Sequence, residues 1–382
     1  MTARKTDSAQ KPSDAVGVEK TAPGNTANLL TRLGRWLERE HLPSKEKIAS
    51  LFAATLTDVA ANTLARQWGI RYLAAEAPER QSLLAGVVQA SIGIEPRGDQ
   101  GSRLFRRLYA QAANLSLLVE LRADMLRWRN QIAGLGTLEH ELEGLLSNWF
   151  DVGMLELRPI NWDSPASLLE KLIQYEAVHE IRSWPDLRRR VANDRRCYAF
   201  FHPRMSGVPL IFVEVAFAPQ MADNVQALLD PSKPNSDLDK ARWAIFYSIS
   251  NTQPGLRGIS FGNFLLKRVI DELLRELPKL KSFATLSPVP RFTEWLSKQD
   301  VTSIEALLSE KEDHPTAQSN PETGTQWVER LRAAAIDPQT SEMIKRNGLR
   351  LVAHYLKSMK GERLIDPVAR FHLGNGACIE RV

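Results

Sequence analysis

WAIFYSIS (residues 243–250) leads into the glycine-punctuated NTQPGLRGISFGNF (residues 251–264) and then into LLKRVIDELLREL (residues 265–277). The first segment is dense in aromatic and β-branched residues and predicts a strand. The third has apolar residues at helical spacing and predicts a helix from about Gly262 to Leu277. Another strand is expected at 281–286. A strand, a loop, a helix and a strand in this order indicate helices packed on a mixed sheet.

The flanking sequence extends this sheet and adds helices. CYAFFH (197–202) and PLIFVEVAF (209–217) have the same strand character. Short helical patterns lie at 164–175 and around Leu187. After the strand expected at 281–286, further helices are expected at 304–308, 325–335 and 342–359.

The half that precedes these strands is helical in pattern almost throughout, from Leu29 to about Trp149. Apolar residues between Leu104 and Leu126 recur mostly every three or four positions, which predicts a buried helix face. No group of chemically useful side chains stands out in this half. We therefore expect it to have a structural role or to form a homo-oligomer, as a dimer or tetramer. Four charged residues fall mostly off the apolar stripe: Arg106, Arg107, Glu120 and Arg122.

Length and composition are those of an ordinary globular protein. The 382 residues exceed what one compact core usually organises, and 43% of them are apolar and 25% charged. We expect a disordered tail at 1–28, a helical domain at 29–150 and a mixed-sheet domain at 151–382. No apolar run is long enough to cross a membrane.

Cysteine content and charge narrow the kinds of site that are expected. Cys197 and Cys378 are the only cysteines, which argues against a disulfide framework or a zinc site and favours a cytoplasmic location. The net charge of +5 suits an anionic ligand, either a nucleotide-bearing coenzyme or a nucleic acid. No basic-aromatic array is present, so nucleic acid is not an expected partner.

The glycine-punctuated loop is a candidate anion site. Gly255, Gly258 and Gly262 stand between a predicted strand and a predicted helix, where backbone N–H groups and the helix dipole favour negative charge. The Rossmann GxGxxG and the phosphate-loop GxxxxGKS patterns are both absent. The spacing resembles the pyrophosphate loop of the GNAT-type N-acetyltransferase fold, which holds CoA. On the residues alone, a plain turn before a helix is the commoner explanation of such glycines.

Two further residues have chemical potential, Ser287 and the distant His372. Pro288 and Pro290 end the strand, which leaves the Ser287 hydroxyl at a strand end. A serine-proline turn is common, however, and a histidine between Phe371 and Leu373 is more often packed than catalytic. The hydrolase pattern GxSxG is absent around Ser287. Taken singly, neither residue identifies a site.

Together, three stretches resemble the malonyl-CoA decarboxylase family: FYSISNTQPGLRGISFGNFLLKRVIDELLRELPKL (246–280), FATLSPVPRFTEWL (283–296) and DPVARFHLGNGACIERV (366–382). The resemblance implies an α + α/β fold, with an N-terminal helical bundle followed by a mixed-sheet, acetyltransferase-like domain. It also implies decarboxylation of malonyl-CoA to acetyl-CoA and CO2 without a metal or organic cofactor. Family members continue beyond Val382 with a helical tail, so we expect the catalytic domain here to lack that tail.

The same resemblance assigns site residues. Ser287 and His372 correspond to the family's active pair, and His372 has a near-neutral pKa suited to giving a proton to C2 of the substrate. Two other functions stay open: an acyl-CoA N-acyltransferase, and a CoA-binding protein without catalytic activity. The residues expected to contact the substrate are Ser248, Arg257, Gly258, Ile259, Ser260, Phe261, Gly262 and Asn263.

Overall fold

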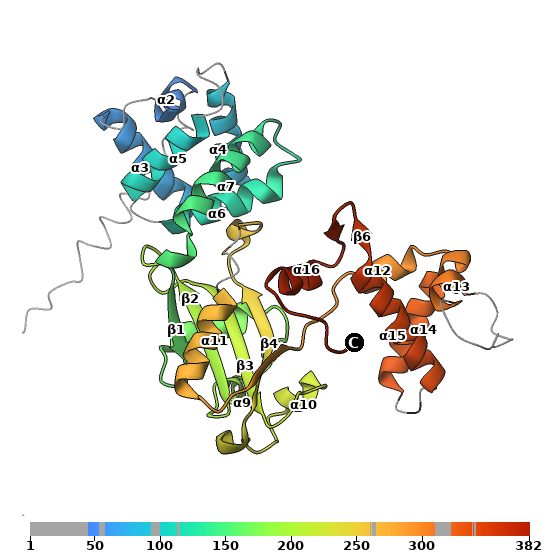
Figure 1. Ribbon diagram of the computed structural model, residues 1–382. Helices are drawn as coiled ribbons and strands as arrows, with labels where there is room; N and C mark the ends of the chain where they lie inside the picture. Colours follow the sequence, from blue (N-terminus) through green and yellow to red (C-terminus); the bar gives the residue numbers. More distant parts are fainter. Residues whose placement is uncertain are drawn as a thin grey trace, which may run out of the picture.

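The computed structural model describes residues 45–52, 58–92, 100–112, 115–259, 261, 265–309, 322–337, 339 and 341–382 (Figure 1). The predicted tail at 1–28 lies outside these ranges. Within them, no helix combines the length and the apolar character that crossing a bilayer would require.

Helices make up the described part of the N-terminal half, as predicted, and residues 29–44 of the expected helical domain lie outside the described ranges. The expected buried face between Leu104 and Leu126 is confirmed, although it is divided between two helices, α5 and α6. Arg107 and Arg122 are both buried, contrary to their expected position mostly off the apolar stripe. The helices of this half are α2 (Lys45–Ala49), α3 (Val59–Ala74), α4 (Ala77–Ser91), α5 (Gln100–Ala112), α6 (Leu115–Trp128) and α7 (Leu135–Trp149), with a 3-10 turn at Ser50–Phe52.

A five-stranded sheet follows, in the order β1-β2-β3-β4-β5. The first four strands are antiparallel neighbours, and β5 runs parallel to β4 because helix α11 (Leu265–Glu276) returns the chain between them. All four predicted strands are present. The strands are β1 (Glu156–Ile160), β2 (Arg195–Phe201), β3 (Pro209–Ala218), β4 (Trp243–Asn251) and β5 (Ser282–Thr285).

Strand β1 was not predicted, because apolar and polar residues do not alternate clearly along it. Arg158 and Pro159 are exposed in its middle. A proline cannot donate to a ladder and is tolerated at a sheet edge, which is the position β1 occupies.

Helices cover both faces of the sheet (Figure 1). Helix α11 buries Leu265, Val269 and Leu273 on one face, and the cluster of apolar side chains there continues into the helical half. The opposite face packs against α8 (Ala166–Tyr175) and α9 (Trp184–Arg190). The helical half and the sheet therefore share one hydrophobic core. Shorter elements are α10 (Val225–Leu229) and the 3-10 turns Val152–Met154, Leu238–Lys240 and Pro254–Leu256.

A β-bulge interrupts the pairing of β3 with β4. Glu214 lies opposite Ser248, but Val215 lies opposite Phe246, so Tyr247 is the extra residue. Strand β4 pairs with β5 only as far as Phe246 and Thr285. Beyond that point the two strands separate and leave one edge of β4 without a neighbouring strand.

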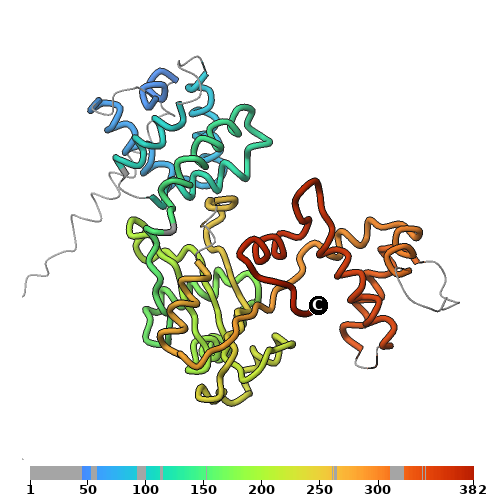
Figure 2. Tube along the Cα trace, viewed as in Figure 1, coloured from blue at the N-terminus to red at the C-terminus, as the bar shows by residue number. Residues whose placement is uncertain are grey.

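A helical lobe stands between Ser287 and His372 in the sequence. Its own apolar core contains Leu296, Trp327 and Leu351. After the lobe, the chain returns to the sheet through the hairpin of β6 (Met359–Lys360) and β7 (Arg363–Leu364), followed by α16 (Pro367–Gly374), in red in Figure 2. The lobe consists of α12 (Phe292–Ser297), α13 (Val301–Ser309), α14 (Gly324–Ile336) and α15 (Glu342–Lys357).

Candidate active site

Ser287 and His372, 85 residues apart in the sequence, meet in space. The Ser287 Oγ and His372 Nε2 atoms are 3.1 Å apart. Ser287 lies just beyond β5, and its hydroxyl is also 3.1 Å from Thr285 Oγ1. A hydroxyl has one proton and two lone pairs, so Ser287 can donate to either neighbour while it accepts from the other. The two side chains can therefore exchange a proton directly.

His372 is positioned by helix α16, which the sequence analysis did not predict. Asp366 caps the helix by accepting a hydrogen bond from the Ala369 N–H at 2.6 Å, and Pro367 occupies the first turn. His372 falls in the last turn, half-buried against its surroundings. This burial lowers the pKa of His372 below its ordinary value, because desolvation disfavours the charged ring. The ring is therefore mainly neutral near pH 7.

A cavity of about 620 Å³ contains the pair. Ser287 and His372 line one part of it. Ser248 on β4 lines another, together with the residues of the glycine-punctuated turn that the structure describes. Ser260, Gly262 and Asn263, also expected to contact the substrate, lie outside the described residues. The expected site residues found on this cavity are Ser248, Arg257, Gly258, Ile259, Phe261, Ser287 and His372.

The turn between β4 and α11 is packed against helix α6 of the helical half. A Cβ atom on Gly255 would come within 1.8 Å of the Val119 carbonyl oxygen, so only glycine permits this approach. The buried Arg122 guanidinium donates to the carbonyl oxygens of Gly255 at 2.7 Å and Arg257 at 2.8 Å. The helical half therefore supports the turn that forms part of the cavity wall, although no cluster of chemically useful side chains was expected there.

Two carboxylates hold Arg122 in this position. Glu139 Oε1 accepts from Arg122 Nε at 2.9 Å, and Glu143 Oε1 accepts from Nη2 at 3.0 Å. Both glutamates lie on α7. Local periodicity cannot reveal such a site, because its carbonyl acceptors are more than 130 residues from Arg122 in the sequence.

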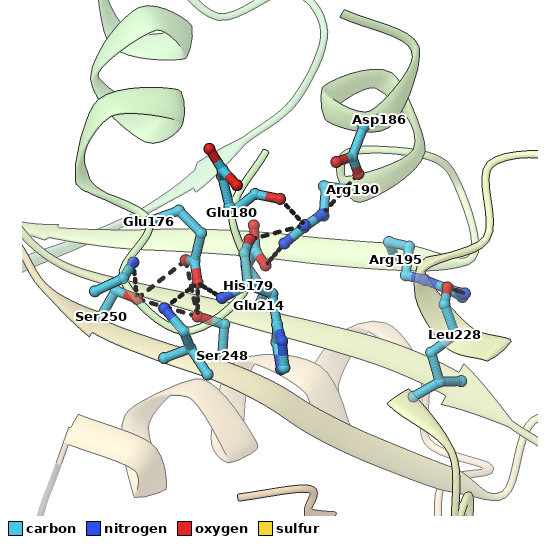
Figure 3. A network of polar contacts seen from close by, with 12 residues as sticks. Glu176, His179, Glu180, Asp186, Arg190, Arg195, Glu214, Leu228, Ser248 and Ser250 are labelled. Atoms are coloured by element: carbon cyan, nitrogen blue, oxygen red, sulfur yellow. Dashed lines mark hydrogen bonds and ion pairs between the residues drawn. The ribbon is translucent and has the colours of Figure 1, made fainter. Parts of the chain in front are cut away.

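The hydroxyl of Ser248, a residue on the cavity wall, is hydrogen-bonded to the buried carboxylate of Glu176 (Figure 3). Its hydroxyl lies 2.7 Å from Glu176 Oε1 and 2.8 Å from Oε2, and the Ser250 hydroxyl donates to Oε2 at 3.0 Å. The backbone N–H groups of Val178 and His179 donate to Oε1. Because its proton is directed to Glu176, the Ser248 hydroxyl has only acceptor lone pairs for other partners.

A buried ion pair adjoins this network (Figure 3). Arg190 Nη1 donates to Glu214 Oε2 at 2.9 Å, and Arg190 Nε donates to Asp186 at 3.1 Å. Burial raises the pKa of Glu214, and the Arg190 guanidinium opposes that rise. Arg190 also donates to the His179 carbonyl oxygen, so it fixes the segment that binds the Glu176 carboxylate.

Comparison with known proteins identifies the family of the chain. Residues 61–150 match the family described as "Malonyl-CoA decarboxylase N-terminal domain", and residues 153–382 match "Malonyl-CoA decarboxylase C-terminal domain". A crystal structure of malonyl-CoA decarboxylase from Cupriavidus metallidurans is 50% identical, with a TM-score of 0.75 over 91% of this chain and 87% of that one. A second, from Rhodopseudomonas palustris, is 35% identical, with a TM-score of 0.70 over 87% of this chain and 86% of that one.

Curated relatives agree with these matches. The chain is 36% identical to "Malonyl-CoA decarboxylase, mitochondrial" of Anser anser anser over 73% of its own length, and spans 58% of the length of that protein. It is 34% identical to the protein of the same name in Mus musculus over 82% of its own length, and spans 66% of that protein. From the matched domains and these relatives, the chain belongs to the malonyl-CoA decarboxylase family.

Proposed function

We propose that this chain decarboxylates malonyl-CoA to acetyl-CoA and CO2. The observation that carries the proposal is the 3.1 Å approach of Ser287 Oγ to His372 Nε2 on the wall of a cavity that also reaches the glycine-punctuated turn. Membership of the malonyl-CoA decarboxylase family supports the same reaction.

The reaction needs a proton donor and a site for developing negative charge. The bond between the carboxylate carbon and C2 breaks, CO2 leaves, and the electron pair delocalises into the thioester as an enolate. In this proposal, Ser287 donates a hydrogen bond to the malonyl group, and preorganised donors of this kind typically contribute about 3 kcal/mol. His372, in its protonated imidazolium form, then gives a proton to C2, which completes acetyl-CoA, and the neutral ring takes up the next proton from solvent.

In this proposal, the CoA portion binds where β4 and β5 move apart and along the turn that follows β4. The unpaired edge of β4 offers backbone groups to an extended pantetheine arm. In this proposal, Gly258, which has a φ of 85° and lines the cavity, donates its N–H to a phosphate oxygen. Arg257 lines the same cavity and adds positive charge. We assign to Ser248, whose hydroxyl donates to Glu176, the role of accepting from an amide N–H of the ligand.

A CO2-release assay with malonyl-CoA tests the proposal on this exact chain. Ser287→Ala and His372→Asn are expected to lower turnover by roughly 100-fold or more, the usual contribution of a positioned acid or base. His354→Asn on α15 is a matched control, since that histidine does not line the cavity. Turnover that persists in either site variant would refute the assigned pair.

The same assay separates the two alternatives. Release of CO2 and acetyl-CoA without an amine favours the decarboxylase, whereas product formation only with an amine acceptor indicates an N-acyltransferase. Binding of CoA esters with no product in either case indicates a binding protein.

Cellular location and assembly stay predictions of this proposal. Cys197 and Cys378 are both unpaired, which is consistent with a reducing cytoplasm. A homo-oligomer through the helical half is also expected, and sedimentation of the purified chain would measure it.

A further inference from the structure

We propose that Arg122 of the helical half is a positioning residue for CoA binding. Its side chain fixes the orientation of the peptide group between Arg257 and Gly258. This inference rests on the proposed function, because it assigns the turn after β4 to the CoA portion of the substrate.

The first step of the argument is the direction of one peptide group. The Arg257 carbonyl oxygen accepts from Arg122 Nη1 at 2.8 Å, so it points toward α6. In a trans peptide the C=O and the following N–H point in opposite directions. The Gly258 N–H therefore points away from α6, and Gly258 lies on the cavity wall. Within the described part of the chain, this N–H donates to no protein acceptor.

The second step is that this peptide needs to be held. Gly258 has a φ of 85°, and glycine adopts conformations on both sides of zero at little cost. A flip of the preceding peptide would turn the Arg257 carbonyl oxygen toward the cavity, where its partial negative charge would repel a phosphate. The Arg122 guanidinium favours the opposite orientation, because a charged donor binds a carbonyl oxygen more strongly than a neutral donor does.

The third step is that Arg122 itself cannot shift. Its side chain is 2% exposed, and Glu139 and Glu143 accept from Nε and Nη2, the two nitrogens that the carbonyls do not contact. The Gly255 backbone rests directly on Val119 of the same helix. The helical half and the turn therefore meet both through the Arg122 side chain and through the backbone of Gly255 and Val119.

Arg122→Lys tests the role of the side chain. Lysine keeps the charge, but its single ammonium group cannot bind both carbonyls, as Nη1 of Arg122 does, and at the same time the two glutamates that Nε and Nη2 bind. Arg80→Lys is the matched control: Arg80 also binds two carboxylates, Glu120 and Asp124, and two carbonyls, of Leu73 and Ala75, but all of these lie within the helical half. Gly255→Ala disturbs the backbone contact and leaves Arg122 in place.

The measurements are the affinity for CoA by calorimetry and the CO2-release kinetics on malonyl-CoA and on malonyl-pantetheine, which lacks the nucleotide. Arg122→Lys and Gly255→Ala are expected to weaken CoA binding by about 10- to 100-fold and to raise the KM for malonyl-CoA similarly. Their kcat/KM for malonyl-pantetheine should stay close to that of the parent chain. Arg80→Lys should leave unchanged the ratio of kcat/KM for malonyl-CoA to kcat/KM for malonyl-pantetheine.

Equal losses on both substrates, or unchanged CoA affinity in folded variants, would overturn the inference. If Arg122→Lys does not fold, Gly255→Ala decides by the same criteria. If the parent chain binds CoA but releases no CO2, the proposed reaction is refuted. The role of Arg122 is then tested by the CoA affinities of the variants alone. A parent chain without affinity for CoA overturns both.

Discussion

The hydroxyl of Tyr355 donates to the carbonyl oxygen of Pro290 at 2.7 Å and so joins the helical lobe to the loop that carries Ser287. The ring lies against Phe292 and Trp295 of α12. Burial, and then the nearby charge of Asp366, raise the pKa of Tyr355 to about 12. Since Asp366 caps the helix of His372, this tyrosine lies between the supports of both members of the pair.

We therefore expect Tyr355→Phe to lower kcat by roughly tenfold, while the free energy of unfolding falls by about 1 kcal/mol for the lost hydrogen bond. The ring packing is retained, so the loop shifts without the lobe unfolding. Steady-state kinetics and thermal unfolding measure the two effects. Tyr109→Phe in the helical half is the control, because that ring stacks on Trp149 far from the pair in sequence. Unchanged kcat in Tyr355→Phe would remove Tyr355 from the positioning of Ser287.

The lowered pKa of His372 predicts a pH dependence of stability. Below about pH 6.5, the unfolded chain binds a proton at this residue more readily than the folded chain does. The free energy of unfolding of the parent chain should therefore fall relative to His372→Asn as the pH drops from about 6.5 through the folded pKa. Above that range the difference should be constant.

Denaturant titrations of both proteins between about pH 5 and 8 give this difference curve. Titration of the ring by NMR provides a second measurement, with the His372 signal assigned by its disappearance in the variant. A ring that titrates at or above about 6.5 would contradict the expected desolvation.

Close packing of α14 on α12 predicts the effect of a single methyl group. A Cβ on Gly324 would lie 1.7 Å from the Leu296 carbonyl oxygen, whereas one on Gly136 of α7 would meet no atom within 4 Å. Gly324→Ala should destabilise the lobe by about 1–3 kcal/mol through overpacking. Gly136→Ala should be neutral or stabilise by up to about 1 kcal/mol, since alanine reduces the entropy of the unfolded chain.

Thermal unfolding of the two variants checks this contrast, and CO2 release by Gly324→Ala shows how strongly the lobe supports the pair. Equal stabilities of the two variants would show that α12 and α14 can separate at little cost.

The strand–loop–helix–strand unit could be predicted from the sequence because each of its elements has a local signal. The strands β3 and β4 are nearly continuous apolar runs, and Leu265, Val269 and Leu273 recur at helical spacing. Ser287 and His372 were paired only through the family resemblance, since no local pattern connects residues on opposite sides of an inserted lobe.

Other residues were missed for identifiable physical reasons. The Asp366-Pro367 start of α16 is a recognisable helix signal, but only a short helix follows it. Arg122 and Glu176 are buried charged residues whose partners come from distant segments, so composition and periodicity treat them as surface residues. Their roles depend on tertiary contacts, which a single sequence does not display.

Substitution of Glu176 tests whether its carboxylate holds Ser248 in place at the cavity. Both of its oxygens accept hydrogen bonds, from the Ser248 and Ser250 hydroxyls and from the N–H groups of Val178 and His179. Glu176→Gln keeps the shape but replaces one acceptor oxygen with a donor NH2 group, so the Ser248 and Ser250 hydroxyls lose the Oε2 acceptor. We expect a loss of about 1–3 kcal/mol in the free energy of unfolding and a rise in KM for malonyl-CoA, because Ser248 is no longer fixed.

Glu180→Gln is the matched control, since that glutamate is close in sequence but its side chain is 79% exposed. Denaturant unfolding and CO2-release kinetics on both variants separate stability from binding. Ser248→Ala should reproduce the rise in KM with a smaller loss of stability, because the remaining donors still satisfy the Glu176 carboxylate. An effect of Glu176→Gln no greater than that of Glu180→Gln would mean that the carboxylate neither stabilises the sheet nor holds Ser248 at the cavity.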